Sequence, residues 1–382
     1  MILSVGRVVT GDQDLQPGYV EIRGDRIDDV RPGVPPSSYW EFPNGILVPG
    51  FIDLQVNGAA GVDLLDCSED DVERLSVYLA STGTTGFLAT FVSCAPDRAR
   101  RAVGILRWAH AAGAELLGMH FEGPALNAVR RGAHEARWLR TPDDPEVRAL
   151  YAQASPDLRL VTLAPELPGA DELIVQLTQE HVVVSAGHSD ATYEQAAHAF
   201  GKGVRMVTHL FNAMRTFHHR DPGLVAAALD DPSCVCGLIA DGVHVHPAVA
   251  RCAYRLLGAD RIALVTDAVA AAGMPPGEYT LAGAPIFVAA DGQPRLPDGT
   301  LAGSTLRMDT AVANAVRWGI PMRDAVRMAA ATPARLLGLS DRGRIEAGMR
   351  ADLCVLGPDG RAALTLVAGR IVGRGGVALP GP

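Results

Sequence analysis

Short apolar runs alternate with helix-like segments through most of the chain. Eight runs rich in Val, Ile, Leu and Phe have the length and composition of buried parallel strands; they cover residues 51–56, 85–92, 116–121, 158–163, 182–186, 204–208, 235–240 and 261–266. Segments with the polar pattern and end signals of helices separate these runs, at residues 68–80, 96–112, 144–154, 171–180, 192–200, 222–229 and 247–257. The alternation predicts a series of parallel βα units.

Eight such units match an α/β fold of the (β/α)₈ TIM-like barrel type, with insertions. A doubly wound open sheet is the alternative, but it favours a Gly-rich phosphate-binding turn after the first strand. No such turn follows residues 51–56. Residues 274–303 are rich in Pro and Gly and contain short β runs, which predicts a hairpin insertion after the eighth strand. Two helices, at 308–318 and 323–337, are expected to complete the barrel.

The two ends of the chain share a different pattern. Short strand-like runs at residues 2–9, 18–22 and 26–30 are separated by turn residues, and similar runs recur at 351–356 and 364–372. Neither end has enough strands to bury a face alone. We therefore expect one small β-sandwich domain built from residues 1–49 and 341–382, beside a barrel formed by residues 50–340.

Composition narrows the classes of partner. The hydrophobic fraction of 48% and the charged fraction of 20% are typical of a globular protein. No apolar run is long enough to span a membrane, and six cysteines without a framework spacing suggest reduced thiols and a cytoplasmic location. The net charge of −9 argues against nucleic acid or an anionic membrane as a partner. A small anionic substrate would need local positive charge, as in residues 130–131 or 218–220.

Two histidines stand at equivalent positions after neighbouring predicted strands. His188 follows the run 182–186, and His209 follows the run 204–208, with one crossover helix between them. In parallel α/β folds the ligand site lies at the carboxyl ends of the strands. Either histidine alone would be interpreted as a core residue. Their repetition at two strand ends favours a metal site, since imidazole is the commonest metal ligand.

Acidic residues at other strand ends strengthen this interpretation. Glu122 ends the third strand and Asp267 follows the eighth. One carboxylate and two imidazoles leave open positions for water, a ligand set typical of catalytic rather than structural zinc. Asp267 could then serve as base for the water and as acid for the leaving group. Each carboxylate alone could be a helix cap or turn residue, but their company favours a chemical role.

Eight motifs in order along the chain resemble the amidohydrolase superfamily and, within it, the N-acetylglucosamine-6-phosphate deacetylase family. Pro49-Gly50-Phe51-Ile52-Asp53 and Ala351-Asp352-Leu353 mark only the superfamily. The Glu-Gly-Pro, His-Leu-Phe-Asn-Ala-Met and Asp-Gly-x-His motifs are specific to the deacetylases. The motifs are Pro49-Gly50-Phe51-Ile52-Asp53, His120-Phe121-Glu122-Gly123-Pro124, Gly132-Ala133-His134, Ala186-Gly187-His188-Ser189, Thr208-His209-Leu210-Phe211-Asn212-Ala213-Met214, Asp241-Gly242-Val243-His244, Thr266-Asp267-Ala268 and Leu301-Ala302-Gly303-Ser304.

The resemblance implies a function and a set of roles. It implies deacetylation of N-acetylglucosamine 6-phosphate to glucosamine 6-phosphate and acetate, with Asp267 as the acid/base and His134 polarising the acetamide carbonyl. It further implies that Glu122, His188 and His209 bind a divalent metal, for which we expect zinc, and that Asn212, Ala213, Arg220, His244 and Ser304 line the sugar-phosphate pocket.

Two further expectations come with the resemblance. Many amidohydrolases carry His-x-His after the first strand, where this chain has Gln55-x-Asn57, as some deacetylases of the family do. Amides are poor zinc ligands, so we expect one metal ion per chain. The resemblance also suggests a homodimer in which Arg220 reaches the neighbouring pocket.

Three alternatives remain at this point. The chain could act on a cyclic amide, or on a different N-acetyl amino sugar phosphate such as the galactosamine epimer. It could also be a catalytically dead barrel that serves as an interaction module. Such a protein should have lost ligands or the base, and this chain retains Glu122, His188, His209 and Asp267.

Overall fold

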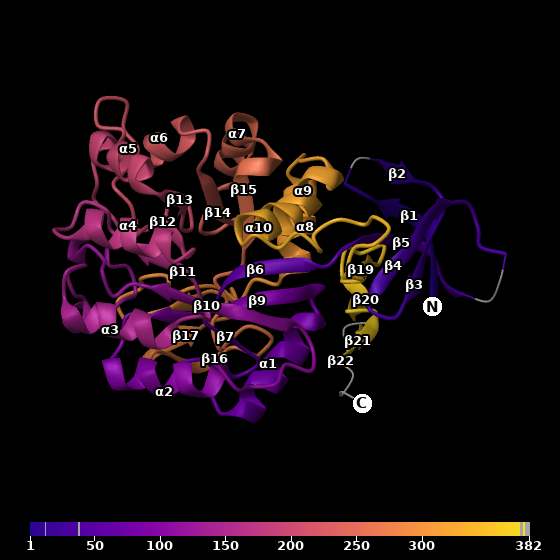
Figure 1. Ribbon diagram of the computed structural model, residues 1–382, viewed down its shortest axis with the longest axis horizontal. Coiled ribbons are helices and arrows are strands. Elements are labelled where there is room, and N and C mark those ends of the chain that lie inside the picture. The colour runs from indigo at the N-terminus through magenta and orange to yellow at the C-terminus, as the bar shows by residue number, and fades with distance from the viewer. Residues whose placement is uncertain (12, 37–38, 375–376, 379–382) are drawn as a thin grey trace.

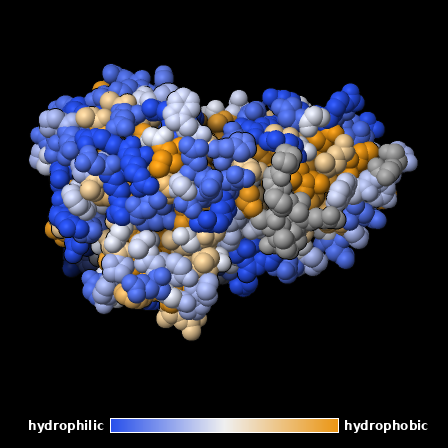
Figure 2. All heavy atoms as spheres, turned by 90° about the horizontal axis from the view of Figure 1, so that it is seen from below, coloured by the Kyte–Doolittle hydropathy of each residue, from blue (hydrophilic) through white to orange (hydrophobic). Residues whose placement is uncertain are grey.

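The computed structural model describes all residues except 12, 37–38, 375–376 and 379–382. Figure 1 shows a molecule of two parts, a large barrel with helices around it and a smaller β domain that contains both chain ends. The face in Figure 2 is dominated by hydrophilic residues, with hydrophobic ones scattered among them. Within the described residues, no helix is long and apolar enough to cross a membrane.

The predicted (β/α)₈ barrel is confirmed. Its strands pair in parallel in the order β15-β14-β13-β12-β11-β10-β9-β6. A bridge between Val56 and Ala268 joins β6 to the segment that follows β15, and the Asp267 amide donates to the Gln55 carbonyl across the same seam at 3.0 Å. The strands are β6 (Phe51–Val56), β9 (Thr84–Val92), β10 (Glu115–Glu122), β11 (Leu158–Leu163), β12 (Val183–Ala186), β13 (Val204–Val207), β14 (Val235–Ile239) and β15 (Ile262–Val265).

Two of the helices begin with the capping boxes that the sequence suggests. Ser68 and Thr192 are the N-caps of α1 and α5, and each forms a capping box with the residue three positions on. The helices are α1 (Glu69–Ala80), α2 (Pro96–Leu106), α3 (Pro145–Ala154), α4 (Ala170–Gln179), α5 (Tyr193–Lys202), α6 (Gly223–Asp230), α7 (Pro247–Leu257), α8 (Met308–Arg317), α9 (Met322–Ala329) and α10 (Ala331–Leu336), with short 3₁₀ turns η1 (Ala128–Arg130), η2 (Ala136–Trp138) and η3 (Ala259–Arg261).

Two predicted helix bounds are wrong. The helix expected at 96–112 ends at Leu106, because the chain turns away to bring the Gly113 amide to the Ser76 hydroxyl at 3.1 Å. The single helix expected at 323–337 is divided into α9 and α10 at Ala330. Pro333 explains the division, since it has no amide hydrogen to donate to the carbonyl four residues earlier and its ring clashes there.

The small β domain is built from both chain ends, as predicted. Its strands belong to one mixed sheet that has a hydrophobic core of its own, including Leu3, Val20, Leu47, Leu353 and Leu366. The expected boundaries at 49/50 and 340/341 stay a prediction. The strands are β1 (Ile2–Val9), β2 (Asp14–Leu15), β3 (Gly18–Arg23), β4 (Arg26–Pro32), β5 (Trp40–Pro49), β19 (Leu353–Leu356), β20 (Ala362–Val367), β21 (Arg370–Arg374) and β22 (Val377–Ala378).

The insertion after β15 contains the predicted hairpin and one additional strand. Strands β16 (Gly277–Leu281) and β17 (Ala284–Val288) pair antiparallel, and β18 (Pro294–Arg295) extends the sheet. A second short hairpin, β7 (Gly58–Ala59) with β8 (Val62–Asp63), follows the first barrel strand. Both insertions follow strand carboxyl ends, so they stand at the mouth of the barrel.

Candidate active site

Three of the predicted site residues occupy the same position relative to their strands. His188, His209 and Asp267 each lie two residues beyond the end of a barrel strand, β12, β13 and β15 respectively. Their backbone φ angles are 49°, 31° and 52°, in the left-handed region that side chains other than glycine seldom adopt. Strained backbone of this kind concentrates at functional sites. At these three residues the chain turns away from the direction of the preceding strand, at the mouth of the barrel.

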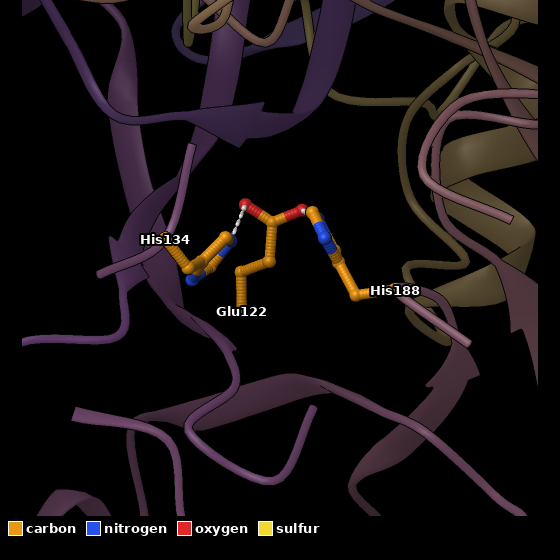
Figure 3. A group of neighbouring side chains, drawn as sticks. All are labelled: Glu122, His134 and His188. Atoms are coloured by element: carbon orange, nitrogen blue, oxygen red, sulfur yellow. Dashed lines mark hydrogen bonds and ion pairs between the residues drawn. The ribbon is translucent and has the colours of Figure 1, made fainter. Parts of the chain in front are cut away.

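The Glu122 carboxylate is the centre of the cluster. Its Oε1 lies 3.2 Å from His188 Nε2 and 3.0 Å from His209 Nε2, and the two imidazole nitrogens are 3.0 Å apart. Its other oxygen, Oε2, faces His134 Nε2 at 3.7 Å. Figure 3 shows the carboxylate between His134 and His188, with all three side chains pointing toward one another. All four residues are buried.

The hydrogen bonds of the two histidines beside Glu122 assign them different roles. His188 Nδ1 faces the Arg130 carbonyl at 3.0 Å, so it must donate, and Nε2 then carries a bare lone pair. His134 Nδ1 instead accepts from the Ser93 amide at 3.1 Å, which places the proton of the neutral ring on Nε2. His188 Nε2 could therefore offer a lone pair to a metal ion, whereas Nε2 of a neutral His134 carries a hydrogen.

The electrostatics of the cluster fit a cation. Burial alone would raise the pKa of Glu122, but its contacts with His134, His188 and His209 hold that pKa well below its usual range. Burial lowers the pKa of His188 to about 4, which favours the neutral imidazole that binds metals. Glu122, His134 and His188 form a group that could hold a metal ion. His209 Nε2 is closer to Glu122 than His134 Nε2 is, at 3.0 Å against 3.7 Å.

The separations of the ligand atoms also fit a cation. Ligand atoms about 2.0–2.1 Å from a tetrahedral zinc lie roughly 3.3 Å apart. The set of Glu122 Oε1, His188 Nε2 and His209 Nε2, separated by 3.0–3.2 Å, is close to that spacing.

The side-chain amides of Gln55, in β6, and of Asn57, just after it, donate hydrogen bonds to the site carboxylates. Gln55 Nε2 donates to both Glu122 Oε1 and Asp267 Oδ1 at 3.0 Å, and Asn57 Nδ2 donates to the same Asp267 oxygen at 2.7 Å. The side-chain oxygens Gln55 Oε1 and Asn57 Oδ1 are buried with no hydrogen-bond partner among the described residues. Exchanging oxygen and nitrogen in either amide would set its oxygen against a carboxylate, so these side chains offer hydrogens here rather than lone pairs.

Asp267 is buried close to the second carboxylate of the site, Glu122. Burial, followed by the neighbouring Glu122 carboxylate, raises the pKa of Asp267 to about 7. A carboxyl whose pKa is close to neutrality is suited to exchange protons during a reaction. Both amide contacts are to Oδ1, which leaves Oδ2 as the oxygen available for proton exchange.

A cavity of about 240 Å³ opens above the cluster. Eight of the predicted site residues line it, namely Glu122, His134, His188, His209, Asn212, Ala213, His244 and Asp267. His244 is oriented by Asp241, whose Oδ2 lies 2.6 Å from its Nδ1, so its Nε2 is left for a ligand. The cavity lining from the described part of the chain includes neither Lys nor Arg.

Comparison with known proteins identifies the family. Residues 46–372 match the Amidohydrolase family. The chain belongs to this family. The amidohydrolase is 39% identical over 331 residues to the N-acetylglucosamine-6-phosphate deacetylase of Vibrio furnissii, which covers 85% of this chain and 82% of that protein. It is also 37% identical over 361 residues to an N-acetylgalactosamine-6-phosphate deacetylase of Escherichia coli O157:H7, covering 93% and 94% of the two chains.

Solved structures of deacetylases are similar over nearly the full length of this amidohydrolase. A mutant N-acetyl-D-glucosamine-6-phosphate deacetylase of Mycobacterium smegmatis, in complex with N-acetyl-D-glucosamine-6-phosphate, has a TM-score of 0.92 at 37% identity, covering 98% of this chain and 99% of that one. The N-acetylglucosamine-6-phosphate deacetylase of Thermotoga maritima has a TM-score of 0.89 at 34% identity, covering 98% and 100%.

Two predicted site residues of this amidohydrolase are not brought into the cavity. Ser304 is buried behind Asp267, where its Oγ donates to the Thr266 carbonyl at 2.5 Å. Arg220 is exposed, and its guanidinium contacts His219 Nε2 at 3.1 Å. Their roles in substrate binding stay predictions.

Sequence analysis also missed residues that support the amidohydrolase site. Ser93 and Asp241 determine, through hydrogen bonds to Nδ1, which tautomers His134 and His244 adopt. Asp241 could have been found, because it stands three residues before His244 in the Asp-Gly-x-His motif. Leu281 and Thr300 of the insertion complete the cavity wall beside Leu301 of the Leu-Ala-Gly-Ser motif, and no local signal in the sequence marks Leu281 or Thr300.

Proposed function

We propose that this amidohydrolase removes the acetyl group of N-acetylglucosamine 6-phosphate, giving glucosamine 6-phosphate and acetate. The observation that carries the proposal is the convergence of Glu122, His188, His209 and Asp267 on one cavity at the barrel mouth. The activity named for the Vibrio furnissii relative, at 39% identity, and the sugar phosphate bound in the Mycobacterium smegmatis structure support this choice of substrate.

We assign Glu122, His188 and His209 as the ligands of one divalent metal ion. A set of two imidazole nitrogens and one carboxylate oxygen is typical of catalytic zinc, which is the metal we expect. Such an ion supplies Lewis-acid activation of water and of the amide carbonyl. The Arg130 carbonyl accepts a hydrogen bond from His188 Nδ1 at 3.0 Å and so fixes the tautomer of His188 that has Nε2 free to bind the ion.

Asp267 is the residue that moves the proton in this proposal. Its Oδ2 accepts a proton from the attacking water as the new C–O bond forms to the acetyl carbon. The same proton then passes to the sugar nitrogen as the C–N bond breaks, so that acetate and the free amine leave. Gln55 and Asn57 hold Asp267 through Oδ1 while this occurs.

His134 and His244 act on the substrate directly. The proton that Ser93 places on His134 Nε2 is available to the acetamide oxygen, where negative charge develops as water adds. His244, oriented by Asp241, presents Nε2 to a sugar hydroxyl. Asn212 and Ala213 line the same wall of the cavity.

The phosphate group requires a cation that the lining of this cavity does not supply. Arg220 is exposed on the loop that follows Asn212, so it is free to reach a second copy of the chain. We therefore propose a homodimer in which Arg220 binds the phosphate in the neighbouring cavity.

Mixing two inactive variants, Arg220→Ala and Asp267→Asn, tests this arrangement. Subunit exchange should restore activity, because one hybrid site receives both intact residues. Activity that stays flat under confirmed exchange would assign Arg220 to its own chain.

We also place the enzyme in the cytoplasm. All six cysteines are free, and Cys67, Cys234, Cys236 and Cys354 are buried in the core. Reduced thiols of this kind are typical of cytoplasmic proteins.

Acetate release from protein of known metal content tests the function. N-acetylglucosamine 6-phosphate should have the highest kcat/KM, and N-acetylglucosamine without phosphate should be roughly ten- to a hundredfold poorer, the loss expected for one charged hydrogen bond. The similarity to the Escherichia coli N-acetylgalactosamine-6-phosphate deacetylase makes that epimer the second substrate to assay. A higher kcat/KM for the epimer would overturn the sugar assignment, and hydrolysis of cyclic amides alone would overturn the function.

A further inference from the structure

A second cavity lies at the end of the barrel opposite the active site. Its volume is about 440 Å³. Pro49 and Asp260, which line it, precede strands β6 and β15, so the cavity lies at the amino ends of the strands. Helices α9 and α10, the turn after β1 and the segment 338–344 form the other walls. In Figure 1 these helices lie beside the β domain.

We propose that this cavity binds a small organic polyphosphate of the size of a nucleoside diphosphate. Five arginines line it, and Asp260 is the one carboxylate in the lining, although Asp14, Glu115 and Glu346 pair with three of the arginines from outside it. The arginines are Arg323, Arg327, Arg335, Arg342 and Arg344. The whole chain has a net charge of −9, so this is a marked local excess of positive charge. A concentration of one sign of charge in a cavity raises the local concentration of ligands of the opposite sign.

Two of the arginines lie close together on α9. Arg323 and Arg327 are four residues apart, so they share one face of the helix and repel each other. Their carboxylate partners are held at long distances, 3.3 Å for Arg323 with Asp14 and 3.5 Å for Arg327 with Asp260. By contrast, the Arg98–Asp66 pair elsewhere on the surface closes to 2.7 Å. Arg327 also donates to the Gly11 carbonyl at 3.2 Å, whereas Arg323 Nε is buried with no hydrogen-bond partner among the described residues.

Arg335 and Arg344 are similarly available. Arg335 is exposed and donates to the Asp260 carbonyl; among the described residues it forms no ion pair with a carboxylate. Arg344 meets Glu346 at 3.3 Å. Arg342 differs, because its side chain is 8% exposed and bonds Glu115 at 2.9 Å. We assign Arg342 to holding the two parts of the molecule together, and the other four to the ligand.

The chemistry of the walls selects the class of ligand. Planar guanidinium groups match phosphate oxygens in pairs and stay charged, so four of them suit two phosphoryl groups. Apolar side chains form the rest of the wall, from Val326, Ala331, Ala334 and Leu339, and can contact an uncharged organic portion. A volume of about 440 Å³ lies in the range of small-molecule sites.

Binding there should stabilise the folded chain without involving the active site. A ligand in this cavity would contact α9, α10 and the turn after β1 at Thr10 and Gly11, which belong to different parts of the molecule. None of these residues lines the cavity that contains Glu122 and Asp267. A ligand that binds only the folded state raises the melting temperature.

Titration calorimetry of the metal-loaded full chain with ADP tests the proposal, with adenosine as the uncharged control. ADP should bind and raise the melting temperature, adenosine should not, and added salt should weaken the binding. Arg335→Gln and Arg327→Gln should each weaken ADP binding about tenfold or more, the effect of losing a charged hydrogen bond. Arg255→Gln, at an exposed position on α7 that does not line this cavity, is the matched control and should bind ADP as the unchanged protein does.

The acetate-release rate of each variant provides the folding control, because none of the three arginines belongs to the catalytic cavity. Absence of ADP binding at millimolar concentration would overturn the proposal. Equal binding of adenosine would overturn the polyphosphate assignment. ADP binding that is unchanged in Arg335→Gln and in the Arg327→Gln/Arg335→Gln double variant would also contradict it, since the nucleotide would then occupy another site such as the active-site cavity.

Discussion

At Asp267, one substitution can remove the proposed proton transfer without changing the size of the side chain. Asp267→Asn preserves the side-chain volume but cannot accept the proton of water. It should keep the metal content and the melting temperature while kcat falls by about 10²- to 10⁴-fold, the usual contribution of general acid–base catalysis. Metal analysis and steady-state kinetics on the same preparation check this. Near-normal turnover with the metal bound would show that another group is the base.

In the proposed site, Gln55 and Asn57 limit the barrel mouth to one metal ion. Their amide hydrogens point at Glu122 and Asp267, and a cation cannot occupy a place toward which donors point. Replacing both by histidine, as Gln55→His/Asn57→His, should create a second imidazole pair and raise the metal content from about one to about two ions per chain. Elemental analysis of both proteins, purified without chelator, measures this. Two tightly held ions in the unchanged protein would contradict the donor arrangement.

At the scale of elements, the loop between β10 and α3 carries His134 past His188. Gly132 of this loop has a φ of 54°, and a Cβ there would lie 3.2 Å from His188 Cε1. Gly132→Ala should therefore displace the His188 ring and lower kcat/KM by roughly tenfold or more, because small misplacements of catalytic groups are costly. Gly104→Ala in α2, where an added Cβ meets no atom within 4 Å, is the control and should leave kcat/KM unchanged. Normal kinetics in Gly132→Ala would show that this loop tolerates the shift.

The barrel strands could be predicted from the sequence because each is a continuous apolar run. Strands β6 and β11 begin and end where the pattern places them, and the residues after β12, β13 and β15 could be aligned at one mouth for that reason. The tautomers of His134 and His188 could not be predicted, since they depend on Ser93 and on the Arg130 carbonyl. Leu281 and Thr300 reach the cavity only through folding of the insertion.

For the whole molecule, a buried carboxyl group where β6 meets the segment after β15 should make the free energy of unfolding depend on pH. Asp53 in β6 accepts hydrogen bonds from Thr266 and Gln55, and burial raises its pKa from 3.8 to about 7. The folded state therefore holds this proton more tightly than the unfolded state. The contribution of protonated Asp53 to the free energy of unfolding is complete below about pH 4. It is lost as the pH rises through about 7, a change on the order of 4 kcal/mol.

Asp53→Asn should remove this dependence, because an amide can accept from both backbone donors and does not titrate. The melting temperature of the unchanged protein, relative to that of the variant, should fall between pH 4 and pH 8. Thermal denaturation of both proteins across that range measures the difference. A difference that is constant with pH, or that grows as pH rises, would show that Asp53 is ionised in the folded protein.

The central claim is that one divalent ion, held by Glu122, His188 and His209, makes this amidohydrolase a deacetylase of N-acetylglucosamine 6-phosphate. Titrating metal-free protein with Zn²⁺ while acetate release is followed tests that claim most directly. Activity should be absent at the start, rise in proportion to added ion, and reach its plateau at about one equivalent per chain. The same titration of Glu122→Gln should reach no comparable plateau. Full activity without metal, or a plateau that requires two equivalents, would contradict the account.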